Sequence, residues 1–218
     1  MPVPSIAIGA RTLRIANIFC VARNYVAHAA EMGSSIGPEP VVFLKPTSAL
    51  MPHGDAIALP DWSVEIHHEA ELVVAIGRDG RNIDRAAAMS YVAGYALGLD
   101  LTARDVQRVA KQNGQPWTLA KGYAGSAALT RFVPAPAIPF PGEVSYRLEI
   151  DGETRQYAEA SQMAFDIPAL LVWLSQRFGL TEGDLVFTGT PEGVGPIRSG
   201  QQLRLVLGGL IDETLSVA

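Results

Sequence analysis

The stretch Val64–Ile76, with the sequence VEIHHEAELVVAI, predicts a long strand at the centre of the protein. Its second half, Leu72–Ile76, is an unbroken apolar run, which is typical of a strand that is buried on both faces. Residues two apart in a strand project from the same face, so we expect Glu69 and Glu71 side by side. Carboxylates that enter a buried strand need a partner, because an unpaired buried charge is costly. The alternative is the solvated face of an edge strand.

The elements around this stretch predict a mixed α+β fold. Strands are expected at residues 15–21, 41–44, 95–101 and 184–188, and hairpins at Asp151-Gly152 and Gly208-Gly209, each of which follows an alternating apolar and polar run. Helices are expected over residues 24–32 and, behind the caps Asp84, Thr102 and Asp166, up to about residues 92, 114 and 179. Strands and helices do not alternate regularly, which disfavours a doubly wound or barrel α/β fold.

Length and composition favour one domain. The 218 residues are 48% hydrophobic, enough for a full core, so we treat residues 1–218 as a single domain and the proline-rich segment 132–142 as a stiff surface connection within it.

A net charge of −5 without a dense Lys/Arg cluster argues against nucleic acid or an anionic membrane surface as a partner. No apolar run approaches the ~20 residues that cross a bilayer. No targeting segment is visible and Cys20 is the single cysteine, so a cytoplasmic location is expected.

Asp100 is the candidate third ligand of a metal site with Glu69 and Glu71. It ends the apolar run 95–99, where a strand would deliver its side chain to the end of a sheet. Three oxygen ligands suit a hard cation, Mg²⁺ or Mn²⁺, better than Zn²⁺. Two alternatives stay open: Asp100 as a helix cap, and a mixed site that includes His67 or His68.

His28 and Glu31 form a second candidate pair. A spacing of three on a helix places them on one face, where a carboxylate orients an imidazole and raises its basicity. The loose glycine, serine and proline residues that follow suggest that the segment of about residues 24–40 is a lid over a ligand. The alternative is an ordinary surface pair.

Basic residues in apolar surroundings form a third group. Arg23, Lys45 and Lys121 would complement an anionic substrate, although each could simply extend its charge to solvent. Cys20 is disfavoured as a nucleophile because its neighbours are apolar. The glycine-rich segment 189–195 leads into no helix, so we interpret it as a substrate-facing turn and not as a phosphate cradle.

Six motifs, in colinear order over about residues 15–210, resemble the fumarylacetoacetate hydrolase family, especially its small acylpyruvate hydrolase and oxaloacetate decarboxylase members. The motifs are FCVARNY (19–25, with His28 and Glu31 after it), FLKPTSA (43–49), HEAEL (68–72), GLDLTARDVQ (98–107), PWTLAK (116–121) and TGTPEGVG (188–195). Ala22 stands where a glycine is common and Ala124 where an acid is common, which places substrate preference in question more than activity.

The resemblance implies a mixed β-roll fold with few helices, a homodimer, and Mg²⁺ or Mn²⁺ held by Glu69, Glu71 and Asp100. It also implies that His28 and Glu31 are the catalytic pair on the lid. Of the remaining positions, the resemblance places these near the substrate: Lys121, Gln107, Thr190 and Arg23.

The expected function is metal-dependent hydrolysis of a C–C bond in 2,4-dioxo acids such as acylpyruvates, with decarboxylation of oxaloacetate at the same site. In this hypothesis a small 2-oxo acid chelates the metal, and His28 with Glu31 activates water. One alternative is an isomerase or decarboxylase of unsaturated 2-oxo diacids from aromatic-ring breakdown. Another is a non-catalytic protein that binds 2-oxo acids.

Overall fold

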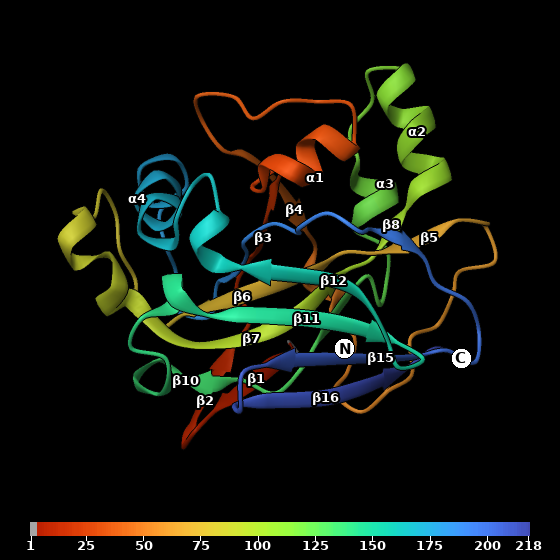
Figure 1. Ribbon diagram of the computed structural model, residues 1–218. Coiled ribbons are helices and arrows are strands. Elements are labelled where there is room, and N and C mark those ends of the chain that lie inside the picture. Colours follow the sequence, from red (N-terminus) through yellow and green to blue (C-terminus); the bar gives the residue numbers. More distant parts are fainter. Residues whose placement is uncertain (1–3) are drawn as a thin grey trace.

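The computed structural model describes residues 4–218, and its strands form four sheets (Figure 1). The first strands along the chain are β1 (Ser5–Ile8), β2 (Arg11–Arg14), β3 (Ile18–Ala22), β4 (Val41–Lys45), β5 (Ile66–His68), β6 (Ala70–Ile76), β7 (Val92–Asp100) and β8 (Thr102–Ala103). They are followed by β9 (Ala127–Leu129), β10 (Val133–Pro134), β11 (Ser145–Ile150), β12 (Glu153–Glu159), β13 (Leu185–Phe187), β14 (Gly195–Pro196), β15 (Gln202–Leu207) and β16 (Ile211–Ser216).

Helices are few and short. The α-helices are α1 (Val26–Glu31), α2 (Arg104–Gln112), α3 (Thr118–Lys121) and α4 (Ile167–Arg177). The 3₁₀ turns are η1 (Thr47–Ala49), η2 (Arg85–Tyr91), η3 (Ala135–Ala137), η4 (Pro141–Glu143) and η5 (Ala160–Gln162). In the chain that the structure describes, no helix is long and apolar enough to span a membrane. The expectation of an α+β fold with few helices is confirmed.

A mixed seven-stranded sheet forms the centre of the protein. Its strand order is β10-β7-β6-β13-β3-β4, and β9 also pairs with β7. The strand β13 runs parallel to β3, and the other pairs are antiparallel. The predicted central strand is β6, in which every residue is buried. Leu72 and Val74 face one apolar cluster, whereas Val73 and Ala75 face the other. Burial on both faces explains the unbroken apolar run.

A four-stranded antiparallel sheet, in the order β12-β11-β15-β16, supplies much of the larger cluster. Its two hairpins are those predicted from the sequence. Asp151 and Gly152 both have positive φ, at 53° and 86°, as a two-residue hairpin turn requires. The helix α4 packs its buried leucines into the same cluster, and the carboxylate of Asp166 accepts a hydrogen bond from the amide of Ala169 (2.9 Å), which confirms the predicted cap.

Three sequence predictions differ from the structure. The long strand breaks at Glu69 into β5 and β6, because β5 pairs with β8 and β14 in a separate small sheet. The helix expected after Asp84 is the 3₁₀ turn η2, and the side chain of Asp84 makes no capping bond. Thr102 lies in β8 and does not cap α2.

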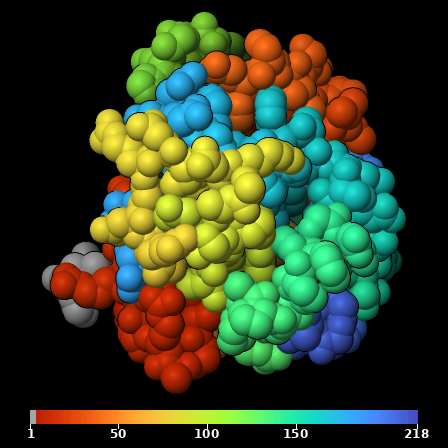
Figure 2. Space-filling view, turned by 90° about the vertical axis from the view of Figure 1, so that its left-hand side faces the viewer, coloured from red at the N-terminus to blue at the C-terminus, as the bar shows by residue number. Residues whose placement is uncertain are grey.

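The proline-rich segment 132–142 lies on the surface but also takes part in a sheet. Val133 and Pro134 pair with β7 at the sheet edge, where the missing N–H of proline is tolerated. In Figure 2 the green residues of this part of the chain lie beside the yellow residues around η2, which cover this side of the molecule.

The packing of the four-stranded sheet is tested by a pair of leucine substitutions. Leu205 is fully buried in β15, and we expect Leu205→Ala to lower the free energy of unfolding by about 2–5 kcal/mol. Leu210 lies in the following turn and is 38% exposed, so Leu210→Ala is the control and should change it by less than about 1 kcal/mol. Denaturant unfolding measures both, and equal losses would contradict the proposed packing.

Candidate active site

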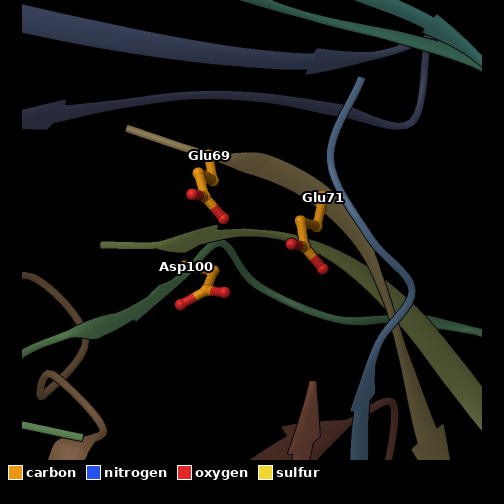
Figure 3. Close-up of side chains that lie close together, drawn as sticks. All are labelled: Glu69, Glu71 and Asp100. Atoms are coloured by element: carbon orange, nitrogen blue, oxygen red, sulfur yellow. The ribbon is translucent and has the colours of Figure 1, made fainter. Parts of the chain in front are cut away.

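Three carboxylates come together where β5, β6 and β7 meet. Glu69 lies at the break between β5 and β6, Glu71 lies in β6, and Asp100 ends β7. In Figure 3 the side chains of Glu69 and Glu71 point the same way, toward Asp100 of the neighbouring strand. One oxygen from each carboxylate lies within 4.8 Å of the others, and all three residues are buried. The backbone amide of Asp100 donates to the carbonyl of Glu69 (2.9 Å), which fixes the two segments against each other.

Buried cations balance two of these acids. The ammonium of Lys121 lies 2.7 Å from an oxygen of Glu69 and 2.7 Å from an oxygen of Asp100. Lys45 lies 2.8 Å from the other oxygen of Asp100. Arg104 lies 2.6 Å from the second oxygen of Glu69. Lys45 is buried and bonded on all sides, so the alternative that it extends to solvent is wrong.

The pKa shifts in this cluster follow from the same contacts. Burial alone would raise the pKa of Glu69, but Lys121 and Arg104 outweigh it and hold that pKa well below its usual range. Burial also disfavours the charged form of Lys121, and Asp100 with Glu69 reverses this and raises the pKa of its ammonium. These shifts favour a charged carboxylate on Glu69 and a charged ammonium on Lys121.

Glu71 is the acid that the protein's own cations leave unbalanced. Over residues 4–218 its carboxylate contacts no lysine or arginine side chain, and one oxygen accepts the amide hydrogen of Gly189 (2.7 Å). Burial, and then the negative charges of Asp100 and Glu69, raise the pKa of Glu71. A divalent cation beside Glu71 would offset the repulsion from Asp100 and Glu69 and would stabilise the charged form of its carboxylate. The all-oxygen donor set therefore fits Mg²⁺ or Mn²⁺.

A cavity of about 360 Å³ opens above the carboxylates. Eight of the nine residues predicted from the sequence line it, and the ninth, Glu31, contacts His28. The predicted residues in the wall are Arg23, His28, Glu69, Glu71, Asp100, Gln107, Lys121 and Thr190. The other lining residues are Val21, Ala22, Met32, Ser34, Phe43, Arg104, Lys111 and Trp117. The structure thus brings the predicted set together.

The His28–Glu31 pair closes one side of the cavity from α1. Nδ1 of His28 lies 3.3 Å from a carboxylate oxygen of Glu31, and His28 is 6% exposed. The same carboxylate accepts the amide hydrogen of Gly193, at 3.2 and 3.3 Å to its two oxygens. Because Nδ1 is engaged, Nε2 is the nitrogen of His28 that is left to exchange a proton with a ligand.

Gln156 holds two walls of the site together from β12. Its carbonyl oxygen accepts the amide hydrogen of Ala70 (2.9 Å), between the two glutamates, and lies 3.0 Å from Nδ1 of His68. Its amide nitrogen donates to the hydroxyl of Thr190 (2.8 Å) and to the carbonyl of Pro191 (3.0 Å). Thr190 in turn donates to the carbonyl of Ala70 (2.9 Å). No sequence signal pointed to Gln156, which lies 86 positions after Ala70.

The helix α2 turns its polar side to the cavity, and Arg104 and Lys111 on that side were not among the residues predicted from the sequence. Arg104 and Gln107 are buried and bonded to each other (2.7 Å), whereas the apolar Val109 of the same helix is 52% exposed. The spacing of Arg104, Gln107 and Lys111 at 0, 3 and 7 was the available signal, because it places all three on one helix face.

The structure also decides the alternatives that the sequence left open for the two histidines, Asp100 and Cys20. His67 contacts Glu65 (3.1 Å) and His68 contacts Gln156, and neither lines the cavity. Asp100 uses its carboxylate on two lysines and makes no helix cap. Burial raises the pKa of the Cys20 thiol, which agrees with its exclusion as a nucleophile.

The fold and the acidic cluster define a class of metal-dependent enzyme. The profile described as "Fumarylacetoacetate (FAA) hydrolase C-terminal" matches residues 17–214, so the chain belongs to the fumarylacetoacetate hydrolase family. The human protein named oxaloacetate tautomerase FAHD1, mitochondrial, is 46% identical over 201 residues, which are 92% of this chain and 91% of the relative. The Arabidopsis thaliana protein of the same name is 42% identical over 200 residues, 92% of this chain and 90% of the relative.

Solved structures agree in fold. A fumarylpyruvate hydrolase from Pseudomonas aeruginosa, in complex with Mn²⁺ and pyruvate, superposes with a TM-score of 0.93 at 37% identity, covering 100% of this chain and 97% of that one. A 5-carboxymethyl-2-hydroxymuconate delta-isomerase from Mycobacterium smegmatis has a TM-score of 0.83 at 35% identity, covering 94% of this chain and 81% of that one. The resemblance seen in the sequence motifs and the divalent-metal prediction are both supported.

The network around Gln156 generates a prediction about stability. Gln156→Leu keeps the bulk of the side chain but takes the partner of the Ala70 amide and of the Pro191 carbonyl and one of the two bonds of the Thr190 hydroxyl, so we expect the free energy of unfolding to fall by about 2–4 kcal/mol. Gln112→Leu, at the exposed end of α2, is the matched control and should stay within about 0.5 kcal/mol of wild type. Chemical unfolding compares them, and a stable Gln156→Leu variant would contradict the role of this network.

Proposed function

We propose that this protein is an Mg²⁺- or Mn²⁺-dependent enzyme of small 2-oxo acids, whose main reaction is the keto–enol tautomerisation of oxaloacetate. The observation that carries the proposal is the buried cluster of Glu69, Glu71 and Asp100 at the floor of a cavity whose wall is cationic. Relatives at 42–46% identity that bear the name oxaloacetate tautomerase support this substrate. The Mn²⁺ and pyruvate in the structure of a 37% identical hydrolase support the metal and the 2-oxo acid.

Glu69, Glu71 and Asp100 are the residues that would hold the ion. When bound, it supplies Lewis acidity that polarises a 2-oxo group. The cations Lys121 and Arg104, which touch Glu69, keep the floor of the cavity from becoming strongly negative. An anionic substrate can therefore approach the acids without prohibitive repulsion.

In tautomerisation a proton leaves C3 of oxaloacetate and a proton is added to the 2-oxo oxygen, so atoms and charge balance. His28 accepts the C3 proton at Nε2, because Glu31 holds Nδ1 and stabilises the resulting imidazolium. Lys121, which is bonded to Glu69 and Asp100 at the cavity floor, is a charged donor suited to stabilise the oxygen on which charge develops. The proton that His28 has taken is then transferred to that oxygen, which returns His28 to its neutral form. Both side chains line the cavity.

Cleavage of 2,4-dioxo acids is the second candidate reaction, and the His28–Glu31 pair beside the cavity favours it. His28 takes a proton from water, and the water oxygen attacks the 4-oxo carbon. The C3–C4 bond breaks, and the proton held by His28 is delivered to C3. Pyruvate and a carboxylic acid, which then loses its proton to water, are the products. Sequence analysis places this hydrolysis first, but the higher identity to tautomerases favours the reverse order.

Product analysis separates the remaining alternatives. Decarboxylation of oxaloacetate releases CO₂ and pyruvate, whereas tautomerisation changes only the enol absorbance. The structural similarity to a 5-carboxymethyl-2-hydroxymuconate delta-isomerase supports the isomerase alternative. An assay with an unsaturated 2-oxo diacid tests it. Binding of oxalate with no product from any substrate would identify a non-catalytic binding protein.

Three sequence predictions stay predictions in this proposal: a homodimer, a cytoplasmic location, and a movable lid over residues 24–40. Light scattering measures the oligomer. Fractionation of cells measures the location, for which the curated relatives are named mitochondrial. Limited proteolysis with and without oxalate measures closure of the lid.

Metal dependence is the first test of the proposal. We expect Glu71→Gln to weaken binding of Mn²⁺ by at least about 10-fold and to abolish turnover of oxaloacetate, because the variant lacks one of three charged ligands. Glu143→Gln, in the exposed turn η4, is a control that should bind Mn²⁺ as wild type does. Calorimetric titration measures affinity. Full activity in the presence of a chelator would reject the scheme.

The second test concerns the acid–base pair. We expect His28→Gln to lower kcat by roughly 10²-fold or more with little change in Mn²⁺ affinity, because the imidazole moves the proton and lies outside the carboxylate cluster. Glu31→Gln should lower kcat less, because His28 stays in place. Stopped-flow enol absorbance and an acylpyruvate assay measure both reactions. Unchanged kcat in both variants would reduce the pair to a structural contact.

A further inference from the structure

The cavity contains two cations that the protein itself does not balance. Lys45, Lys121 and Arg104 are each bonded to Asp100 or Glu69. Arg23 and Lys111 also have side chains at the cavity. Within residues 4–218, neither makes an ion pair or a side-chain hydrogen bond. Their charges are therefore available to a ligand.

Lys111 stands at the outer end of the cavity wall. It lies in the last turn of α2, seven residues and so about 10 Å along the helix from Arg104, which contacts Glu69. Its ammonium lies 5.4 Å from the ring centroid of Trp117, also in the cavity wall, and this cation–π contact holds the side chain at the opening.

Arg23 approaches the same space from the other wall. It follows β3 and precedes α1, and its φ of 60° is in the left-handed region that a non-glycine residue rarely adopts. The side chain of Asn24 fixes this corner, because its amide nitrogen donates to the backbone carbonyl of Phe165 (3.0 Å) and its amide oxygen accepts the backbone amide hydrogen of Phe165 (2.8 Å). In Figure 1, α1 and α2 stand at the same end of the molecule. Both helices contribute residues to the cavity wall.

The electrostatic surroundings of Lys111 favour an anion. Burial first, and then the positive charges of Arg104, Lys121 and Arg23, lower the pKa of Lys111, and Glu69 opposes this only in part. A carboxylate placed among these groups would relieve their mutual repulsion and form charge-assisted hydrogen bonds.

We propose that Lys111, together with Arg23, binds the distal carboxylate of the substrate and makes the enzyme selective for dicarboxylic 2-oxo acids. The inference rests on the proposed function for the orientation of the ligand, with its 2-oxo acid end at Glu69, Glu71 and Asp100. A monocarboxylic ligand of the same length leaves Lys111 and Arg23 without a partner and so binds more weakly.

The test compares 2-oxoglutarate with 2-oxopentanoate, which have the same chain length and differ in the distal carboxylate. Calorimetric titration in the presence of Mn²⁺ should show at least about 10-fold tighter binding of 2-oxoglutarate to wild type. Lys111→Met should remove most of this preference while its affinity for 2-oxopentanoate changes less than about 3-fold. Lys111→Arg keeps the charge and should keep the preference.

Arg108→Met is the matched control, because Arg108 lies on the same helix but pairs with Glu65 on the outside (2.7 Å). It should bind both acids as wild type does. The proposal is overturned if wild type shows no preference, or if Lys111→Met keeps the preference or weakens both acids equally. Absence of turnover with every 2-oxo acid would reject the proposed function, yet the ratio of affinities would still decide the role of Lys111.

Discussion

Mutual repulsion among three buried carboxylates is the constraint on which this site depends. Glu69, Glu71 and Asp100 lie where water cannot screen them, so their charges must be balanced by the protein or by a bound cation. Lys45 and Lys121 act on Asp100, and Lys121 and Arg104 act on Glu69. Glu71 receives only a backbone amide, which leaves room in the charge balance for a divalent ion. The packing of β4, α2 and α3 around the acids is thus also an electrostatic requirement.

The sequence indicated the acids of the site and two nearby lysines, Lys45 and Lys121, but not that these lysines pair with the acids. Glu69 and Glu71 were predictable because the two-residue period of a strand is local, and Asp100 because it ends an apolar run. Arg104 was hidden because a charged residue on a helix is ordinarily solvated, whereas α2 buries Arg104 together with Gln107. Gln156 was hidden because its partners are far away in the chain, and a long-range contact of one amide side chain leaves no periodic pattern.

The fold was likewise predictable where it depends on neighbouring residues and not where it depends on distant ones. Hairpins and the α4 cap depend on a few adjacent residues, and the structure has them where Asp151-Gly152, Gly208-Gly209 and Asp166 predict. The break at Glu69 was not predictable, because it arises from a choice of partners: β5 joins β8 and β14, whereas β6 joins the large sheet. That break matters for function, since it is the point at which the chain leaves one sheet and delivers a carboxylate to the next.

The loop of residues 189–193 connects the carboxylates at the floor of the cavity with the helix α1. The amide of Gly189 binds Glu71, the hydroxyl of Thr190 binds the carbonyl of Ala70, and the amide of Gly193 binds Glu31 beside His28. Moving α1 away from this loop breaks the contact of Gly193 with the carboxylate that orients His28. The orientation of the imidazole therefore depends on the same contact that holds α1 against the loop, and a ligand that strengthens this contact also fixes the base over its own reacting carbon.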